Sequence, residues 1–307
     1  MKVLNNATKL TEEDLPISMA LGVFDGIHKG HQDVLNRTIH YAAGIGGTAW
    51  VLTFEPHPLK VLRPDDAPPL LTSKEHKLRL LEAIGVDGCV LMEFTEQLAQ
   101  MAPEAFVETL CITAPTLQAI YVGQNWRFGK GGNGDVTLLK KLSEKLNIST
   151  EIVNPILWRD RVISSSRIRD AVSQGALDDA AAMLDRPFSI LGTVTEGHRI
   201  GRQLGYPTAN LDPHNEVHPP RGVYAVRAIL DGADHRGVIN IGVRPTFKGS
   251  EDVPLSLELH LPGIGRSLYG SDIEVLFLKR LRDEHKFRTR DDLKRQIARD
   301  IAQAARC

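Results

Sequence analysis

The chain has 307 residues, of which 42% are hydrophobic and 24% charged, a globular composition of about two domains that excludes a disordered protein. Its formal net charge of −1 gives no overall field that would attract nucleic acids or membrane surfaces. No run reaches the roughly 18 apolar residues that span a bilayer, and the first residues lack an apolar signal region, so a cytoplasmic protein is expected.

Strand-like and helix-like segments alternate over the first 186 residues. The apolar strand candidates are 17–24, 48–54, 86–92, 118–122 and 151–158, with helical patterns between them. Such alternation predicts an α/β domain, a mostly parallel, doubly wound sheet covered by helices. Sheets of this kind bind ligands at the C-terminal ends of their strands, where the chain turns into the following helix.

The first of these turns carries the motif GVFDGIHKGH at residues 22–31. Its glycines let a phosphate approach the backbone, and the amides at the start of the next helix favour an anion. His28 and His31 are three residues apart, so both imidazoles can face one point and donate to phosphate oxygens. The alternative is a pair of surface histidines beside a turn. The residues expected to bind ATP here are Gly22, Phe24, Asp25 and Gly30, and the expected catalytic residues are His28 and His31.

Two later strand exits in this half carry unusual segments. TFEPHPLKVL covers residues 53–62, and the glycine-rich VGQNWRFGKGGNGD covers residues 122–135. A loop with that many glycines is expected either to be mobile or to wrap around a ligand.

The segment ISSSRIRD at residues 163–170 is predicted to begin a helix. Ser164 or Ser165 is placed as the N-cap, and Arg167 falls in the first turn, where a cation opposes the helix dipole. A polyphosphate above that helix end would explain the arginine. An ordinary capping serine is the alternative.

The pattern changes near residue 187 to short strand candidates separated by turn residues, up to about residue 278. This favours a small antiparallel β-barrel, followed by an amphipathic helix at roughly 290–305. Leu293, Ile297 and Ile301 are spaced by four and are expected to dock that helix on the barrel. The predicted domains are therefore 1–186 and 187–307.

The first loop of the second domain reads GTVTEGHRIGRQLGYPTANL, residues 192–211. Gly197 and Gly201 suit a phosphate loop, and Pro207 fixes the backbone before Thr208 and Asn210. The two neutral oxygens of Thr208 and Asn210 suit Mg²⁺ bridged to ATP phosphates. For PTAN alone, a proline turn with an asparagine cap is the alternative.

Residues 255–261, LSLELHL, alternate strictly between apolar and polar side chains. The leucines are expected on one face and Ser256, Glu258 and His260 on the other. On most antiparallel strands such a polar face simply meets solvent.

HxGH after a strand, followed by the serine-arginine segment, resembles the signature of the nucleotidyltransferases. With 53–62 and 122–135 it resembles the adenylyltransferase module of bacterial bifunctional FAD synthetases. That resemblance implies nucleotide contacts from the later part of the domain and an apolar wall for the isoalloxazine ring. The implied nucleotide-binding residues are Asn125, Arg161, Ser164, Ser165 and Arg167. The implied flavin wall is Phe54, Pro56, Pro58 and Phe128.

The second domain resembles the riboflavin kinases across about 20 residues around PTAN and again in the E-x-H motif. The resemblance implies that Glu258 is the general base toward the terminal ribityl hydroxyl. It implies that ATP is bound by Gly197, Gly201, Arg202, Pro207, Thr208 and Asn210.

Together the two resemblances imply an enzyme that makes FMN from riboflavin and ATP in the barrel, then FAD and pyrophosphate from FMN and a second ATP in the first domain. Mg²⁺ would serve both sites, ATP, riboflavin and FMN would be the partners, and the chain would be a monomer or weak oligomer. One rival is another nucleotidyltransferase, acting on CTP or pantetheine phosphate, with an unrelated second domain. The other is a flavin-binding regulatory protein without catalysis.

Overall fold

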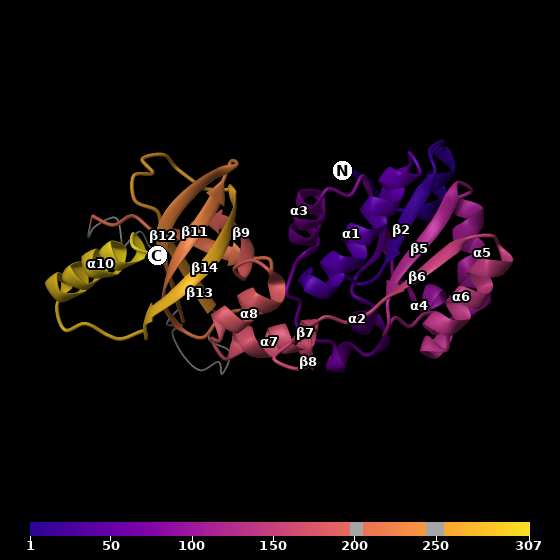
Figure 1. Cartoon of the computed structure of the whole chain (residues 1–307). Coiled ribbons are helices and arrows are strands. Elements are labelled where there is room, and N and C mark those ends of the chain that lie inside the picture. The colour runs from indigo at the N-terminus through magenta and orange to yellow at the C-terminus, as the bar shows by residue number, and fades with distance from the viewer. Residues whose placement is uncertain (197–204, 244–254) are drawn as a thin grey trace. The chain divides into compact units, whose positions relative to one another are not determined.

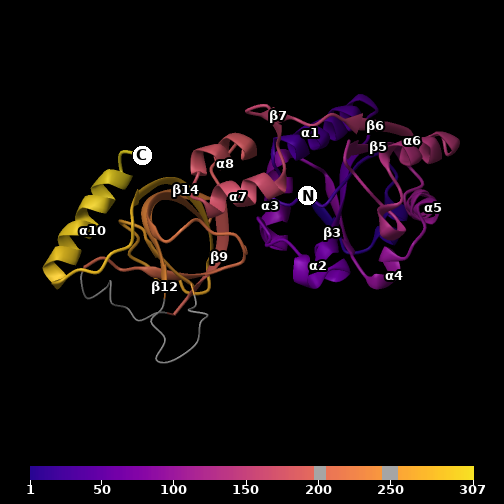
Figure 2. The ribbon, with the colours of Figure 1, turned by 90° about the horizontal axis from the view of Figure 1, so that it is seen from below.

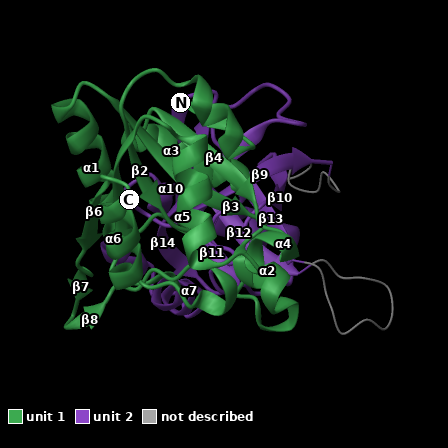
Figure 3. Ribbon diagram, turned by 90° about the vertical axis from the view of Figure 1, so that its right-hand side faces the viewer, with its two compact units in different colours: residues 1–69, 74–165 green, residues 70–73, 166–307 purple. Residues whose placement is uncertain are grey.

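The computed structural model describes residues 1–196, 205–243 and 255–307, and the chain forms two compact units (Figure 3). The first unit contains residues 1–69 and 74–165, and the second contains residues 70–73 and 166–307. The two units meet at residues 165 and 166 rather than at 186 and 187. The boundary between the two sequence domains at 186/187 stays a prediction. No helix in the described ranges is long and apolar enough to cross a membrane.

A six-stranded, fully parallel sheet forms the centre of the first unit, in the order β1-β4-β3-β2-β5-β6 (Figure 1). A short hairpin, β7–β8, follows it. The strands are β1 (Lys2–Leu4), β2 (Ile17–Leu21), β3 (Thr48–Glu55), β4 (Gly88–Glu93), β5 (Leu117–Gly123), β6 (Ser149–Val153), β7 (Leu157–Trp158) and β8 (Arg161–Val162).

Helices cover both faces of this sheet, because its strands are apolar on both sides. On β2, Ile17 and Met19 pack into one core with α5 and α6, whereas Ala20 packs into the opposite core with α1 and α3. The predicted doubly wound α/β fold is therefore confirmed. The helices of this unit are η1 (Ala7–Glu12), α1 (Lys29–Gly44), α2 (Pro58–Leu62), η2 (Pro64–Asp66), α3 (Lys74–Ile84), α4 (Glu96–Ala99), α5 (Pro103–Thr113), η3 (Lys130–Gly132) and α6 (Val136–Lys145).

The second unit is built on a closed antiparallel barrel, in the order β10-β13-β12-β11-β14-β9, as predicted. Figure 2 shows it as a ring with helix α10 on its outer side. The strands are β9 (Ser189–Thr195), β10 (Ala209–Pro213), β11 (Gly222–Leu230), β12 (Ala233–Val243), β13 (Leu255–His260) and β14 (Asp272–Arg282). The helices are α7 (Ser165–Ser173, whose first residue belongs to the first unit), α8 (Leu177–Leu184) and α10 (Arg290–Ala304).

Helix α10 docks on the barrel through fewer residues than its four-residue spacing predicts. Ile301 and Ala304 pack against Val223 and Val238, as expected of the docking face. Leu293 and Ile297 are partly buried like Ile301, and all three line a cavity of the same unit, but only Ile301 belongs to the packed cluster. Part of the apolar stripe of α10 is therefore available to a ligand.

A short segment from the N-terminal half, residues 70–73, belongs to the barrel unit. The buried Asn215 donates to the carbonyl oxygens of Leu71 and Ser189 and accepts from the Leu191 amide at 3.2 Å. The amide of Leu70 donates to Glu216 Oε2 at 2.8 Å. The chain thus enters the second unit briefly before returning to the first as α3.

Candidate active sites

The histidine motif lies where the order of strands in the sheet reverses. The chain runs from β2 outward to β3 on one side, and β5 later pairs with the other side of β2. The segments that follow β2, β3 and β5 therefore leave the same edge of the sheet from adjacent strands. This is the topological switch point, where doubly wound sheets bind their ligands.

The two histidines form a stacked pair at the start of α1. His28 is the N-cap of the helix, and its Nδ1 accepts from the His31 amide at 3.3 Å. The ring centroids lie 3.7 Å apart with an interplanar angle of 15°. Because Nδ1 of His28 is an acceptor, the proton of its neutral ring is on Nε2, which leaves that nitrogen as a donor.

The imidazole of His31 is held neutral by its surroundings. Burial is the largest cause that lowers its pKa well below the usual value, and the positive charge of Lys77 lowers that pKa further. Its Nδ1 is enclosed and has no hydrogen-bond partner among the described residues. Lys77, a buried residue of α3, was not predicted from the sequence; its own pKa is lowered by burial, against the attraction of Asp25 and Glu55.

Close packing explains the glycines of the turn. A Cβ on Gly22 would lie 2.9 Å from Cζ of Phe24, whose backbone has a φ of 53°. The Phe24 ring in turn meets the His31 ring edge-on, with centroids 5.2 Å apart. A Cβ on Gly30 would lie 3.2 Å from Cε1 of His28. Both glycines therefore keep the histidine pair in its stacked position.

The serine-arginine segment at residues 163–170 contacts the histidine motif at residues 22–31 through Ser165. Its hydroxyl donates to the carbonyl oxygen of Asp25 at 2.9 Å, and Asp25 is itself buried. Ser164 precedes α7, while Ser165 is the first residue of that helix rather than its cap. Arg167 is partly buried on α7 in the second unit, and Arg161 is exposed on β8.

The glycine-rich loop after β5 is held in place. Phe128 and Gly134 form an isolated antiparallel bridge, and the Lys130 amide donates to the Met101 carbonyl at 2.7 Å. Asn125 is exposed at the beginning of this loop. The loop therefore has a defined backbone conformation, and its contact with a ligand stays a prediction.

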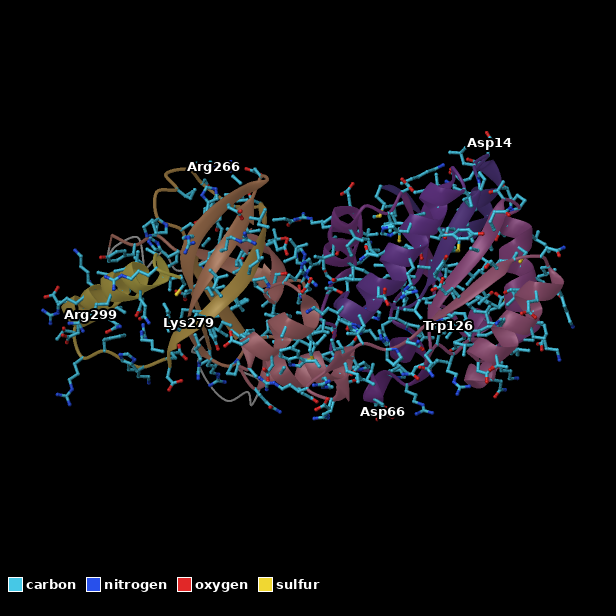
Figure 4. All side chains as sticks on the ribbon, in the orientation of Figure 1. Asp14, Asp66, Trp126, Arg266, Lys279 and Arg299 are labelled. Carbon is cyan, nitrogen blue, oxygen red and sulfur yellow. The ribbon has the colours of Figure 1, made fainter. Side chains whose placement is uncertain are left out.

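The aromatic residues expected to form a flavin wall differ in exposure. Phe54 and Phe128 are 7% and 6% exposed and belong to the core. Pro56 and Pro58 remain partly exposed. Trp126, labelled in Figure 4, is also partly exposed and stacks on Phe128 at 4.6 Å. Its position next to Phe128 in the loop was the only sequence signal for it.

In the barrel, Glu258 stands in a row of side chains that crosses several strands. It pairs with Asn210 of β10 on one side and with Asn240 of β12 on the other. Directly opposed residues of antiparallel strands project to the same face. Glu258 is thus flanked by two amide side chains, of which Asn240 was not predicted.

The polar face of β13 lines a cavity instead of meeting open solvent. Ser256 donates to Glu258 Oε1 at 3.4 Å, and Nδ1 of His260 lies 2.8 Å from the Pro207 carbonyl oxygen. Leu257 and Leu259 point into the barrel and are 1% exposed. The strict alternation predicted from the sequence is therefore present, with the chemical groups on the cavity side.

That cavity has a volume of about 710 Å³, lies within the second unit and is also lined by residues 284–290 and α10. Thr208, Asn210 and Glu258 all line it. Gly197, Gly201 and Arg202 lie outside the described residues. Among the residues that are described, no cluster of three or more His, Cys, Asp or Glu side chains could hold a metal ion.

Comparisons with known proteins cover both units. The family described as FAD synthetase matches residues 10–167, and the family described as riboflavin kinase matches residues 184–307. The bifunctional riboflavin kinase/FMN adenylyltransferase of Bacillus subtilis (strain 168) is 36% identical over 300 residues, 97% of this chain and 94% of that protein. The Escherichia coli (strain K12) protein of that name is 35% identical over 283 residues, 92% and 90% of the two chains.

The chain belongs to this bifunctional family. It is a riboflavin kinase in its barrel and an FMN adenylyltransferase in its parallel-sheet domain, as the motifs predicted. The rival with an unrelated second domain is wrong, because the kinase family matches that domain. The crystal structure of a macrolide-efflux protein from Streptococcus pneumoniae shares the fold, with a TM-score of 0.83, 28% identity and coverage of 99% of this chain and 98% of that one.

Replacing Gly22 by alanine should damage adenylyl transfer alone. The added Cβ displaces the Phe24 ring and, through it, His31, so FMN-to-FAD conversion should slow by about tenfold or more. Riboflavin-to-FMN conversion should be unchanged. Gly44→Ala is the control, because a Cβ there meets nothing within 4 Å. An FAD rate equal to that of the native chain would contradict the steric role of Gly22.

The depressed pKa of His31 should appear in the pH dependence of stability. The folded state resists protonation of His31, whereas the unfolded chain takes up that proton. The free energy of unfolding is therefore unaffected by His31 above the unfolded pKa of about 6.5 and decreases as pH falls below that value. The loss is at most about 1.4 kcal/mol per pH unit. Urea unfolding between pH 7.5 and 5.5 should show a shallower decline for His31→Gln, and His40→Gln, exposed on the same helix, should follow the native slope. If the free energy of unfolding fell with pH at the native slope in both variants, the lowered pKa of His31 would be contradicted.

Proposed function

We propose that Glu258 is the general base of the kinase reaction and that the pair His28 and His31 carries adenylyl transfer. The single observation that carries the kinase half is the place of Glu258, between Asn210 and Asn240 on the wall of the cavity. A carboxylate there can accept the proton of the terminal ribityl hydroxyl as that oxygen attacks the γ-phosphate of ATP. The hydroxyl of Ser256, which donates to Glu258, holds the carboxylate in position.

Thr208 and Asn210 are the residues proposed to hold Mg²⁺ with ATP. Both line the same cavity as Glu258, and both offer neutral oxygens, which suit a hard cation whose other ligands are phosphate oxygens. When bound, Mg²⁺ would neutralise charge on the transferred phosphoryl group. The Pro207 carbonyl oxygen, in contact with His260 Nδ1, anchors the segment that precedes Thr208.

In the parallel-sheet domain, the FMN phosphate is proposed to attack the α-phosphate of ATP directly, without a covalent enzyme intermediate. Nε2 of His28 is a donor, and the neutral ring of His31 lies against it, so negative charge on the phosphates meets hydrogen-bond donors and the start of α1. Ser165 supports this turn through the Asp25 carbonyl oxygen. The further nucleotide contacts stay predictions for Gly22, Phe24, Gly30, Asn125, Arg161, Ser164 and Arg167.

The flavin of the second reaction is proposed to rest on the glycine-rich loop and the segment after β3. Pro56, Pro58 and Trp126 are the partly exposed apolar groups there, while Phe54 and Phe128 support them from the core. Aromatic and proline faces of this kind suit a flat tricyclic ring. The Mg²⁺ requirement, the 1–186/187–307 domain division and a monomeric or weakly oligomeric chain also remain predictions.

Two variants test the division of labour between the domains. Glu258→Gln keeps the size of the side chain but removes the base, so FMN formation should fall by about 10²–10⁴-fold while FMN-to-FAD conversion continues. His31→Gln should do the reverse, so that FMN accumulates from riboflavin and ATP. The products are resolved by chromatography with riboflavin or FMN as the starting flavin.

Each variant is the folding control for the other, because each must keep one of the two activities. If both reactions fall equally in both variants, the two-site assignment is lost.

A further inference from the structure

The cavity of the barrel unit is lined by groups of different chemistry. Thr208, Asn210 and Glu258 are the groups proposed for phosphoryl transfer. Phe287 and the α10 side chains Leu293 and Ile297 are apolar groups of the same lining, among charged side chains such as Lys286 and Arg288. Riboflavin combines a polar ribityl chain with a flat ring system, so a lining of this kind can meet both parts of it.

Arg282 lies on the same strand-crossing row as Glu258. The row runs from Arg282 of β14 to Val223, then to Asn240, and then to Glu258, each pair directly opposed. Arg282 and Glu258 are separated by three strand-to-strand spacings. Their backbones therefore lie about 14 Å apart along the barrel surface. Arg282 also lines the cavity, at that distance from the proposed base.

The guanidinium of Arg282 binds α10 through a buried ion pair. Its Nε lies 3.2 Å and 3.0 Å from the two carboxylate oxygens of Asp300, and its Nη2 lies 2.9 Å from Oδ2. Gln296 Nε2 also donates to Oδ1 of Asp300, at 2.8 Å. The side chain of Asp300 is 4% exposed and that of Arg282 is 19% exposed. This contact fixes the helix whose partly buried leucine and isoleucine face the cavity.

The remaining nitrogen of the same guanidinium holds the loop between β14 and α10. Nη1 donates to the Asp283 carbonyl oxygen at 3.0 Å and lies 3.2 Å from Nδ1 of His285. The guanidinium carbon lies 5.6 Å from the centre of the Phe287 ring. One side chain therefore joins a barrel strand, the loop and the helix, all three of which line the cavity.

A buried ion pair is a weak device for stability alone, because removing two charges from water costs about as much as their attraction returns. Its geometry, however, is demanding. Only a planar fork can donate to both carboxylate oxygens of Asp300 and to the loop at once, and lysine cannot reproduce it. The pair therefore suits a role in fixing positions.

We propose that Arg282, through Asp300, is a positioning residue that holds the loop around Phe287 and helix α10 as the wall against which riboflavin rests in the kinase reaction. The inference builds on the proposed function, because it takes this cavity as the kinase site. Arg282 acts on the site through other side chains; no hydrogen bond joins it to Glu258 among the residues that the structure describes.

The test compares Arg282→Lys with Arg295→Lys in the full chain. Arg295 forms an exposed ion pair with Asp292 on the same helix and does not line the cavity, so it is a matched control. Arg282→Lys should raise KM for riboflavin by about tenfold or more with a much smaller effect on kcat, since binding and not chemistry is impaired. Riboflavin affinity, measured by quenching of flavin fluorescence, should fall in parallel.

A second variant keeps the test decisive. Asp300→Asn has the same shape and should also raise KM for riboflavin, and the double variant should be no worse than the poorer single one, because both remove the same contact. FMN-to-FAD conversion should be unchanged in all of them, because that reaction is assigned to the other unit, and a retained kcat for FMN formation shows that the barrel is folded. A lower unfolding free energy with an unchanged KM for riboflavin in both single variants would overturn the proposal. That outcome is distinct from a fully active Glu258→Gln, which would remove the proposed function itself.

Discussion

The two-residue period of side chains along a β-strand is the constraint on which both sites depend. In β13 it sends Leu257 and Leu259 into the barrel, and it leaves Ser256 and Glu258 on the cavity wall. In β2 it distributes Ile17, Met19 and Ala20 between two cores, which requires helices on both faces and therefore a parallel sheet. A parallel sheet in turn brings the exits of β2, β3 and β5 to one edge. A shift of one residue in β13 would bury the proposed base.

Local patterns of this kind explain why much of the molecule could be predicted from its sequence. The strand alternation, the glycines of the HxGH turn and the final helix each depend on neighbours within a few residues. Other features depend on which strands pair, and pairing joins positions far apart in the chain. Asn240 stands beside Glu258 only because β12 and β13 are neighbours, and Arg282 joins their row only through β11. Lys77 is likewise one polar residue of an ordinary amphipathic helix until the fold brings its charge to His31.

The two sites handle phosphate charge by different means. In the parallel-sheet domain, the histidine pair has an enclosed nitrogen, a buried lysine nearby and a lowered pKa of His31, which favours a neutral imidazole. In the barrel, the proposed base stands on the wall of an open cavity between two amides. A base needs access to a hydroxyl and to the water that finally takes its proton, whereas a site that stabilises developing charge gains from low dielectric.

The path of the chain between the units adds a constraint that a division into two sequence domains misses. Residues 70–73 are part of the barrel unit, where the Leu71 carbonyl accepts from the buried Asn215 and the Leu70 amide donates to Glu216. A fragment that begins at residue 187 lacks this segment, so one of the carbonyl partners of the Asn215 amide would be missing, and an unsatisfied buried polar group costs about 1–3 kcal/mol. The next residues after the segment form α3, which carries Lys77 toward the histidine pair of the other unit. A single stretch of chain therefore contributes to the packing of the kinase unit and to the electrostatics of the proposed adenylyl-transfer site.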